Sequence, residues 1–178
     1  MEFNKRNIKV FIISGKARSG KDTISNIIKE YYSDKKTISI SFGHYIKDYA
    51  KRVSNWDGNE DTKPRELLQQ LGIELIRNKI DNKLFIRRVL EDIEVFSYFY
   101  DIIIVDDVRL LDEIIALKEN YKDLISIRVI RDNYNNGLTD SQNNHLTETN
   151  LDNYSNFDYI ITNDINLKEK VIEILDEV

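Results

Sequence analysis

A glycine-rich turn after an apolar run constrains this chain most. Residues 10–14 read Val-Phe-Ile-Ile-Ser, Gly15 follows, and Gly20 and Lys21 come next after four residues. The spacing G-x-x-x-x-G-K between a strand and a helix is typical of a phosphate-binding loop, because its glycines let successive backbone N–H groups turn inward around an anion. A chance glycine turn would need neither the lysine nor the helix. The sequence therefore predicts a nucleoside triphosphate site at the end of its first strand.

The residues after the lysine differ from the usual loop. Asp22 stands where Ser or Thr normally follows, and Thr23 comes next. A carboxylate can hold Mg²⁺ directly or through water, since this ion prefers oxygen ligands and keeps several waters. We therefore expect ATP to bind with Mg²⁺. The expected ATP contacts within the loop are Gly15, Ala17, Ser19, Gly20, Lys21, Asp22 and Thr23.

Strand-like and helix-like patterns alternate along the chain. The apolar, β-branched runs are residues 8–14, 37–42, 101–106, 124–130 and 158–162. Apolar residues at helical spacing fill the intervals between these runs. This order predicts an α/β fold of the P-loop NTPase type, a five-stranded parallel sheet with helices on both faces. With 178 residues, we expect one domain over residues 1–178.

Two polar stretches interrupt this rhythm. Residues 54–63 are polar. They lie within a predicted helical region at about 43–98, which we expect to bind the molecule that accepts a phosphoryl group. Residues 133–153 are rich in Asn, Asp, Thr and Ser. A structureless loop of that length in a compact domain is usually a lid or a binding loop. We expect a lid at about 132–150.

Composition excludes several classes of protein. The net charge of −5 argues against a nucleic-acid binder. The sequence has no run of about 18 apolar residues, which argues against a membrane span. The absence of cysteine excludes disulfides and thiolate catalysis. The first residues do not read as a signal peptide, so we expect a cytoplasmic protein.

A second charged cluster follows the third predicted strand. Asp106 and Asp107 come directly after the apolar run 102–105, and Arg109 is two residues further on. Ligands of open α/β sheets bind at this carboxyl edge. The carboxylates can hold Mg²⁺ together with Asp22, or accept a proton. The alternative interpretation is a pair of solvated turn acids.

A predicted helix carries a third group of candidates. Arg65, Gln69 and Gly72 fall within about 40° on a helical wheel. Arg suits a phosphate, Gln has a donor and an acceptor for a base edge, and glycine leaves room for a flat ring. A solvated arginine and glutamine fit the pattern equally well. The residues expected to face the core are Leu67, Leu68, Leu71 and Leu75.

Other charged residues have simpler interpretations. Lys47 follows the second strand and can reach a substrate phosphate, whereas His44 reads as a structural or surface histidine. Arg131, before the lid, can cover the adenine or meet the transferring phosphate. Arg128, inside the fourth strand, is expected to form an ion pair.

With these residues assembled, the chain resembles the bacteriophage-type deoxynucleoside monophosphate kinases over nearly its whole length. The matching pieces are residues 14–23, residues 65–72, Asp107-Val-Arg109 with Glu113, Arg131, His145-Leu-Thr-Glu148 and Asn163-Asp164. The resemblance implies a nucleoside monophosphate kinase-like fold and ATP-dependent transfer to a (deoxy)nucleoside monophosphate. A departure is Leu110-Leu111-Asp112, where the family often has Phe-Pro-Asn.

The resemblance also implies roles for individual residues. The implied catalytic residues are Lys21, Arg18, Asp107, Arg109 and Arg131. Asn163 joins the ATP site. The implied acceptor contacts are Lys47, Arg65, Gln69, Gly72, Arg109, His145 and Glu148. The implied partners are Mg²⁺, ATP and a nucleoside monophosphate.

The chain is also similar to the animal-type phosphomevalonate kinases. These share the loop, the Asp-x-Arg element and a pattern like Leu151-Asp-Asn-Tyr-Ser-Asn-Phe-Asp158. Both families move a γ-phosphoryl group onto an acceptor phosphate, and the motif Arg-x-x-x-Gln-x-x-Gly favours the nucleotide. A non-catalytic nucleotide-dependent switch or subunit is a further alternative, although the base-reading Asn-Lys-x-Asp of GTPases is absent. The oligomeric state stays open, a homodimer included.

Overall fold

The computed structural model describes residues 3–178, and its centre is a five-stranded parallel sheet. The strands lie in the order β2-β3-β1-β4-β5, and every neighbouring pair is parallel. Their bounds are β1 Lys9–Ser14, β2 Thr37–Ser41, β3 Ile102–Val108, β4 Ile125–Ile130 and β5 Tyr159–Thr162. Each of the five predicted runs forms a strand, so the predicted fold class is confirmed.

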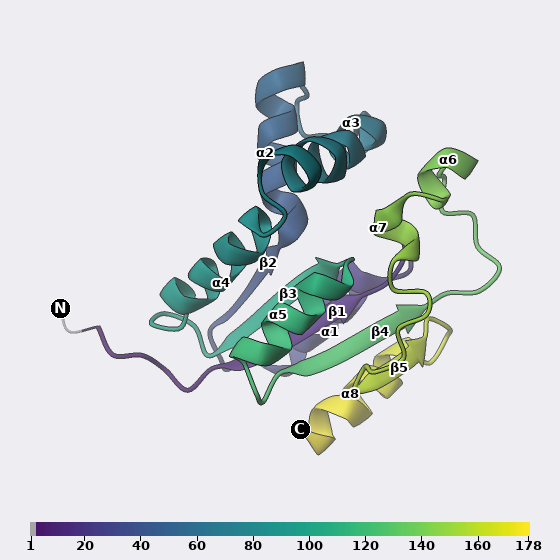
Figure 1. The fold of residues 1–178 in the computed structure, drawn as a ribbon. Coiled ribbons are helices and arrows are strands. Elements are labelled where there is room, and N and C mark those ends of the chain that lie inside the picture. Colours follow the sequence, from purple (N-terminus) through teal and green to yellow (C-terminus); the bar gives the residue numbers. More distant parts are fainter. Residues whose placement is uncertain (1–2) are drawn as a thin grey trace.

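Helices connect the strands and cover both faces of the sheet (Figure 1). The longer ones are α1 Lys21–Tyr31, α2 Phe42–Ser54, η1 Gln70–Ile80, α4 Leu84–Phe96, α5 Leu111–Asn120 and α8 Leu167–Glu177. The short ones are α3 Arg65–Gln69, α6 Asp140–Asn143 and α7 Leu146–Thr149. None of these helices is long and apolar enough to span a membrane, as judged over the described residues.

The core consists of two apolar layers, one on each side of the sheet. Val10 and Ile12 of β1 belong to the layer beneath α4 and α5, whereas Phe11 and Ile13 belong to the layer beneath α1 and α8. All four side chains are buried. Strands that are covered on both faces need apolar residues at successive positions, which explains why β1 and β3 lack polar alternation.

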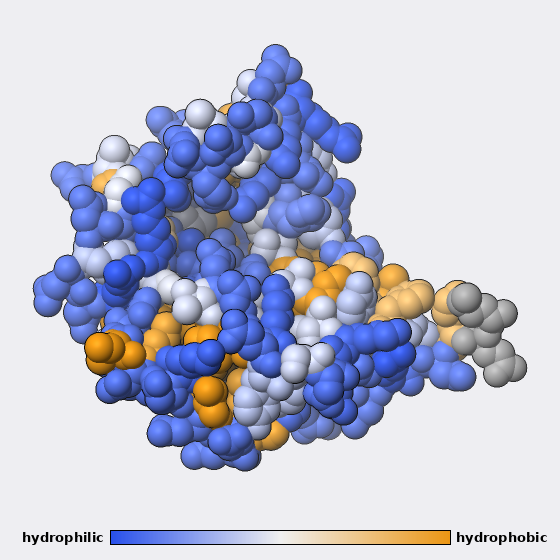
Figure 2. Space-filling model, turned by 180° about the vertical axis from the view of Figure 1, so that it is seen from behind, coloured by the Kyte–Doolittle hydropathy of each residue, from blue (hydrophilic) through white to orange (hydrophobic). Residues whose placement is uncertain are grey.

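Two groups of helices rise beyond the carboxyl ends of the strands. One group, the helical arm, consists of α2, α3 and η1, and the other consists of α6 and α7 from the predicted lid (Figure 1). A hollow lies between the arm and the body of the protein, and hydrophilic side chains surround it (Figure 2). Ligands of open α/β sheets bind at this edge.

The helix that carries Arg65 differs from the prediction. It begins as the α-helix α3 and continues from Gln70 as the π-helix η1. Its hydrogen bonds then run from residue i to i+5, so the wheel of 100° per residue no longer describes which side chains share a face. Ile73 and Ile76 are buried, whereas Leu75 is 42% exposed. The predicted leucine ridge is therefore wrong at Leu75.

Candidate active site

The phosphate-binding loop curls around the ammonium group of Lys21. Gly20 has φ +111° and Arg18 φ +57°, so the loop makes its turn in left-handed conformations. Lys21 Nζ donates to Gly15 O at 2.9 Å and to Lys16 O at 2.8 Å. Burial lowers the pKa of Lys21, and the nearby carboxylate of Asp107 opposes that effect. The loop therefore holds a buried cation against its own backbone carbonyl groups.

Asn163, after β5, supports the loop from the other side. Its Nδ2 donates to Ser19 O at 2.7 Å. A Cβ atom on Gly20 would lie 2.3 Å from this nitrogen, so only glycine lets the loop approach Asn163 so closely. The side chains of Asp22 and Thr23 in the first turn of α1 are exposed, on the solvent side of the loop.

The two aspartates lie together in a β-bulge near the end of β3. Ile12 pairs with Val105 and Ser14 with Val108, so Asp106 and Asp107 together face a single residue of β1. Asp107 has φ +61°. Because a bulge changes the direction of the side chains in it, the two carboxylates lie in different surroundings.

Asp107 points toward the phosphate-binding loop and is held by two cations. Its Oδ1 accepts from Arg109 Nε at 2.6 Å and lies 3.3 Å from Lys21 Nζ. Burial disfavours this charge, but Arg109 and Lys21 hold the pKa of Asp107 below its ordinary value. Asp106 lies instead beside Ser41, Tyr45 and β2.

The residues present fit a magnesium ion held mainly by water. Burial, and then the charges of Asp107 and Asp22, raise the pKa of Asp106 to about 7. Carboxylates that repel one another in this way are suited to a divalent cation. Among residues 3–178 no three His, Asp or Glu side chains converge as a metal site, and Mg²⁺ typically needs only one or two carboxylates. Asp107 is engaged as a counter-ion, which leaves Asp22 and Asp106 as the carboxylates for this role.

Arg109 stands between the loop and the lid. Its Nη1 donates to the carboxylate of Glu148 and, at 3.4 Å, to Thr147 O. Burial opposes the charge of Arg109, yet Asp107 and Glu148 raise its pKa above the ordinary value. These contacts on two sides fix the orientation of the guanidinium.

A buried ion pair between Glu113 and Arg77 connects the backbone of Arg109 to the helical arm. Glu113 Oε2 accepts from the backbone N–H groups of Arg109 at 3.0 Å and Leu110 at 3.1 Å. Glu113 Oε1 accepts from Arg77 Nη2 at 2.7 Å. Burial raises the pKa of Glu113 to about 7. Sequence reasoning missed Arg77, although it is the next cation along the helix that carries Arg65 and Gln69.

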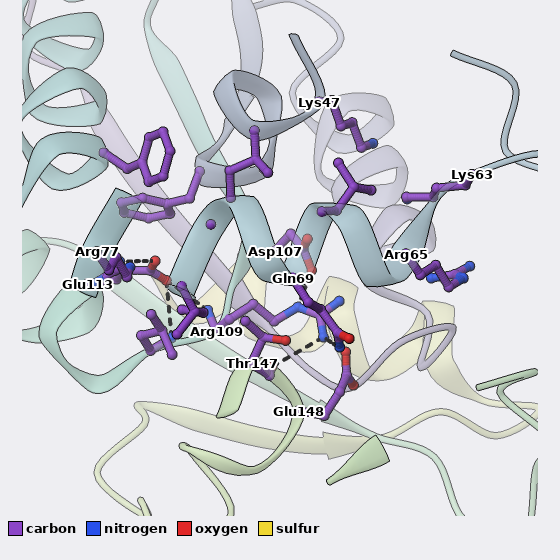
Figure 3. A pocket seen from close by; sticks show the side chains of 18 of the residues that line it. Lys47, Lys63, Arg65, Gln69, Arg77, Asp107, Arg109, Glu113, Thr147 and Glu148 are labelled. Atoms are coloured by element: carbon purple, nitrogen blue, oxygen red, sulfur yellow. Dashed lines mark hydrogen bonds and ion pairs between the residues drawn. The ribbon is translucent and has the colours of Figure 1, made fainter. Parts of the chain in front are cut away.

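One cavity brings these elements together (Figure 3). Arg77 and Glu113 lie at one end, Lys47, Lys63 and Arg65 at the other, and Gln69, Asp107 and Arg109 between them. The apolar part of its lining includes Phe42, Ile46, Leu68, Ile73, Phe85 and Leu110. The cavity therefore combines apolar walls with a few converging charges, which is typical of a small-molecule site.

Most of the expected acceptor residues line this cavity. They are Lys47, Arg65, Gln69, Gly72, Arg109 and Glu148. His145 is not among the residues that line this cavity, and its contact with the acceptor stays a prediction. Its Nδ1 accepts from Thr147 N at 3.3 Å and caps α7, because the first N–H groups of a helix need an outside acceptor.

The other candidate arginines lie around the phosphate-binding loop and β4. Arg131 Nη1 donates to Arg18 O at 3.3 Å, and its guanidinium lies over the ring of Tyr134. Arg18 is exposed and lies against Gly137 of the lid. Arg128 pairs with Asp152 at 3.5 Å, which confirms the expected ion pair.

Comparison with solved structures shows that the fold is similar to that of two kinases and of a third protein. The APS kinase of Mycobacterium tuberculosis, in complex with AMPPNP and APS, has a TM-score of 0.57 at 11% identity over 96% of this chain and 97% of its own. TT1252 from Thermus thermophilus has 0.57 at 14% over 98% and 99%. A gluconokinase from Sinorhizobium meliloti has 0.53 at 14% over 97% and 92%. Identities this low establish likeness of fold alone.

Comparison of sequences is more specific. No protein of curated function matches the chain. The family model described as phosphomevalonate kinase matches residues 13–123. That segment contains the phosphate-binding loop, the helical arm and the Asp107–Arg109 turn, and so most of the site. The chain belongs to the phosphomevalonate kinase family.

Proposed function

We propose that this protein transfers the γ-phosphoryl group of ATP to the phosphate of a (deoxy)nucleoside monophosphate. One observation carries the proposal, namely that a single cavity joins the two sets of candidate residues. It is lined by Asp107 and Arg109, and Asp107 lies beside Lys21 of the donor loop. The same cavity is lined by Arg65, Gln69 and Gly72 of the helix that we assign to the acceptor. A donor site and an acceptor site that open into each other are what direct transfer requires.

The donor side supplies alignment and charge. Lys21 and the loop N–H groups bind the outer phosphates, and Asn163 keeps the loop in shape. Asp22 and Asp106 would hold Mg²⁺ or its waters, and the ion would neutralise charge on the triphosphate. The acceptor oxygen is already anionic, so no strong base is needed, and Arg109 balances the charge that develops during an in-line transfer.

The acceptor side suits a flat, neutral ring. Phe42 and Phe85 are buried side chains of the cavity wall, and Gly72 adds no side chain to it. Gln69 can offer an amide to a base edge. The guanidinium of Arg77 is neutralised by Asp112 at 2.6 Å and Glu113 at 2.7 Å, so this end has little attraction for a carboxylate.

Phosphomevalonate is the second candidate acceptor, and two observations favour it. The first is the family match. The second is the end of the cavity where Lys47 and Lys63 lie with Arg65 and share one carboxylate, Glu60. This excess of positive charge suits an acceptor with a carboxylate in addition to its phosphate. A purely structural nucleotide-binding subunit would have no use for the acceptor cavity.

Release of ADP with a panel of acceptors distinguishes these functions. The panel contains the common ribo- and deoxyribonucleoside monophosphates and mevalonate phosphate, with ATP and Mg²⁺ throughout. We expect at least one nucleotide to raise the rate far above ATP hydrolysis alone. Gln69→Leu should raise KM for that nucleotide, with Gln70→Leu, an exposed neighbour, as the matched control. Slow hydrolysis that no acceptor accelerates would reject phosphoryl transfer, and acceleration by mevalonate phosphate alone would establish the second candidate.

A further inference from the structure

A carboxylate of the lid bridges the donor loop and the acceptor arginine. Glu148 is buried on α7, and its Oε2 accepts from the backbone N–H of Ala17 at 2.9 Å. Its other oxygen accepts from Arg109 Nη1. The Glu148 carboxylate thus accepts hydrogen bonds from the donor loop, at the Ala17 N–H, and from the guanidinium of Arg109 on the acceptor side.

The lid holds both polar atoms of the same residue in the loop. While Glu148 takes the N–H of Ala17, the hydroxyl of Tyr134 donates to Ala17 O at 2.5 Å. Gly137, between these two lid residues in the chain, lies against Arg18. The lid is therefore fastened directly to the loop at Ala17 and Arg18.

The charges of this cluster already balance without a phosphate. Lys21 and Arg109 contribute two cations, and Asp107 and Glu148 contribute two carboxylates. A triphosphate that arrives here adds negative charge to a neutral, largely buried cluster. One of the carboxylates has to move or be neutralised, because adjacent buried anions repel strongly.

We infer that Glu148 occupies the position of the transferring phosphoryl group, and that ATP must displace it from Ala17. The phosphoryl oxygens then accept from the same two donors, the Ala17 N–H and the Arg109 guanidinium. Glu148 is thus a positioning residue that orients Arg109 and competes with the donor. This inference rests on the proposed phosphoryl transfer at this site.

The test measures the affinity of Mg²⁺–AMPPNP by calorimetry in the absence of any acceptor. Glu148→Gln keeps the size and the acceptor oxygen but removes the charge. It should bind the analogue about tenfold more tightly than the wild type, while kcat with the acceptor falls several-fold because Arg109 loses its ionic partner. Glu74→Gln, an exposed carboxylate on η1, makes the same change of charge and should alter neither value.

A merely structural role for Glu148 would weaken binding and turnover together, so unchanged or weaker binding by Glu148→Gln overturns the inference. If that variant does not fold, Tyr134→Phe releases the same lid from Ala17 O. It should tighten analogue binding two- to threefold, and an unchanged affinity would overturn the inference equally. Because no acceptor is present, failure of the proposed acceptor chemistry leaves this binding test intact.

Discussion

Substitution of Lys21 by alanine tests the donor site most directly. Lys21 Nζ lies 3.3 Å from Asp107 Oδ1, and a phosphoryl oxygen in the loop would approach the ammonium at a similar distance. Two unit charges at that separation interact by about 5 kcal/mol when the effective dielectric constant is about 20. Only the part that is stronger in the transition state than in the ground state accelerates transfer.

We therefore expect Lys21→Ala to lower kcat about a thousandfold, which corresponds to about 4 kcal/mol of transition-state stabilisation. The assay is coupled release of ADP at saturating ATP and acceptor. Lys16→Ala is the matched control, because Lys16 belongs to the same loop but is exposed and pairs with Asp152 at 2.8 Å. Its kcat should stay within about twofold of the wild type.

The thermal unfolding of Lys21→Ala separates catalysis from folding. Loss of the ammonium leaves Asp107 paired with Arg109 at 2.6 Å, so the carboxylate keeps a counter-ion and the fold should persist. A folded Lys21→Ala protein whose kcat stays within tenfold of the wild type would show that this lysine is not the donor cation.

Three further predictions concern the acceptor helix, the buried ion pair and the loop. Gly72→Val should raise the acceptor KM at least tenfold and leave the ATP KM unchanged, because even a Cβ atom would lie 2.9 Å from Ile46 in the cavity wall; equal rises in both KM values would contradict this. The pKa of Glu113 is raised to about 7, so the native state binds its proton more tightly than the unfolded state. The free energy of unfolding should therefore fall as pH rises from about 5 to 7, by at most about 1.4 kcal/mol per pH unit. Urea titrations of Glu113→Gln should lack this component, and identical profiles would refute it. Asn163→Ala should raise the ATP KM several-fold and destabilise the fold by about 1 kcal/mol, since it removes the hydrogen bond to Ser19 O; unchanged nucleotide binding would argue against its support of the loop.

Local patterns in the chain are enough to predict the sheet and the donor loop. A run such as residues 102–105 is apolar at every position because the strand is covered on both faces. The spacing of Gly15, Gly20 and Lys21 indicates the loop because its glycines let the backbone N–H groups turn inward around a phosphate. Both signals lie in short stretches of sequence, so they can be recognised without knowledge of the rest of the fold. The same holds for the charged residues at the end of β3.

The roles of individual carboxylates depended on contacts between distant segments. A bulge against β1 turns Asp107 toward Lys21 and leaves Asp106 elsewhere, although the two are adjacent in the chain. Glu148 reaches Ala17 across 131 positions of sequence. The π-helix that exposes Leu75 was equally hidden from a wheel drawn at a fixed angle. Which anion each cation meets is decided by packing, because charge pairing acts over a few ångströms in space, whatever the separation along the chain.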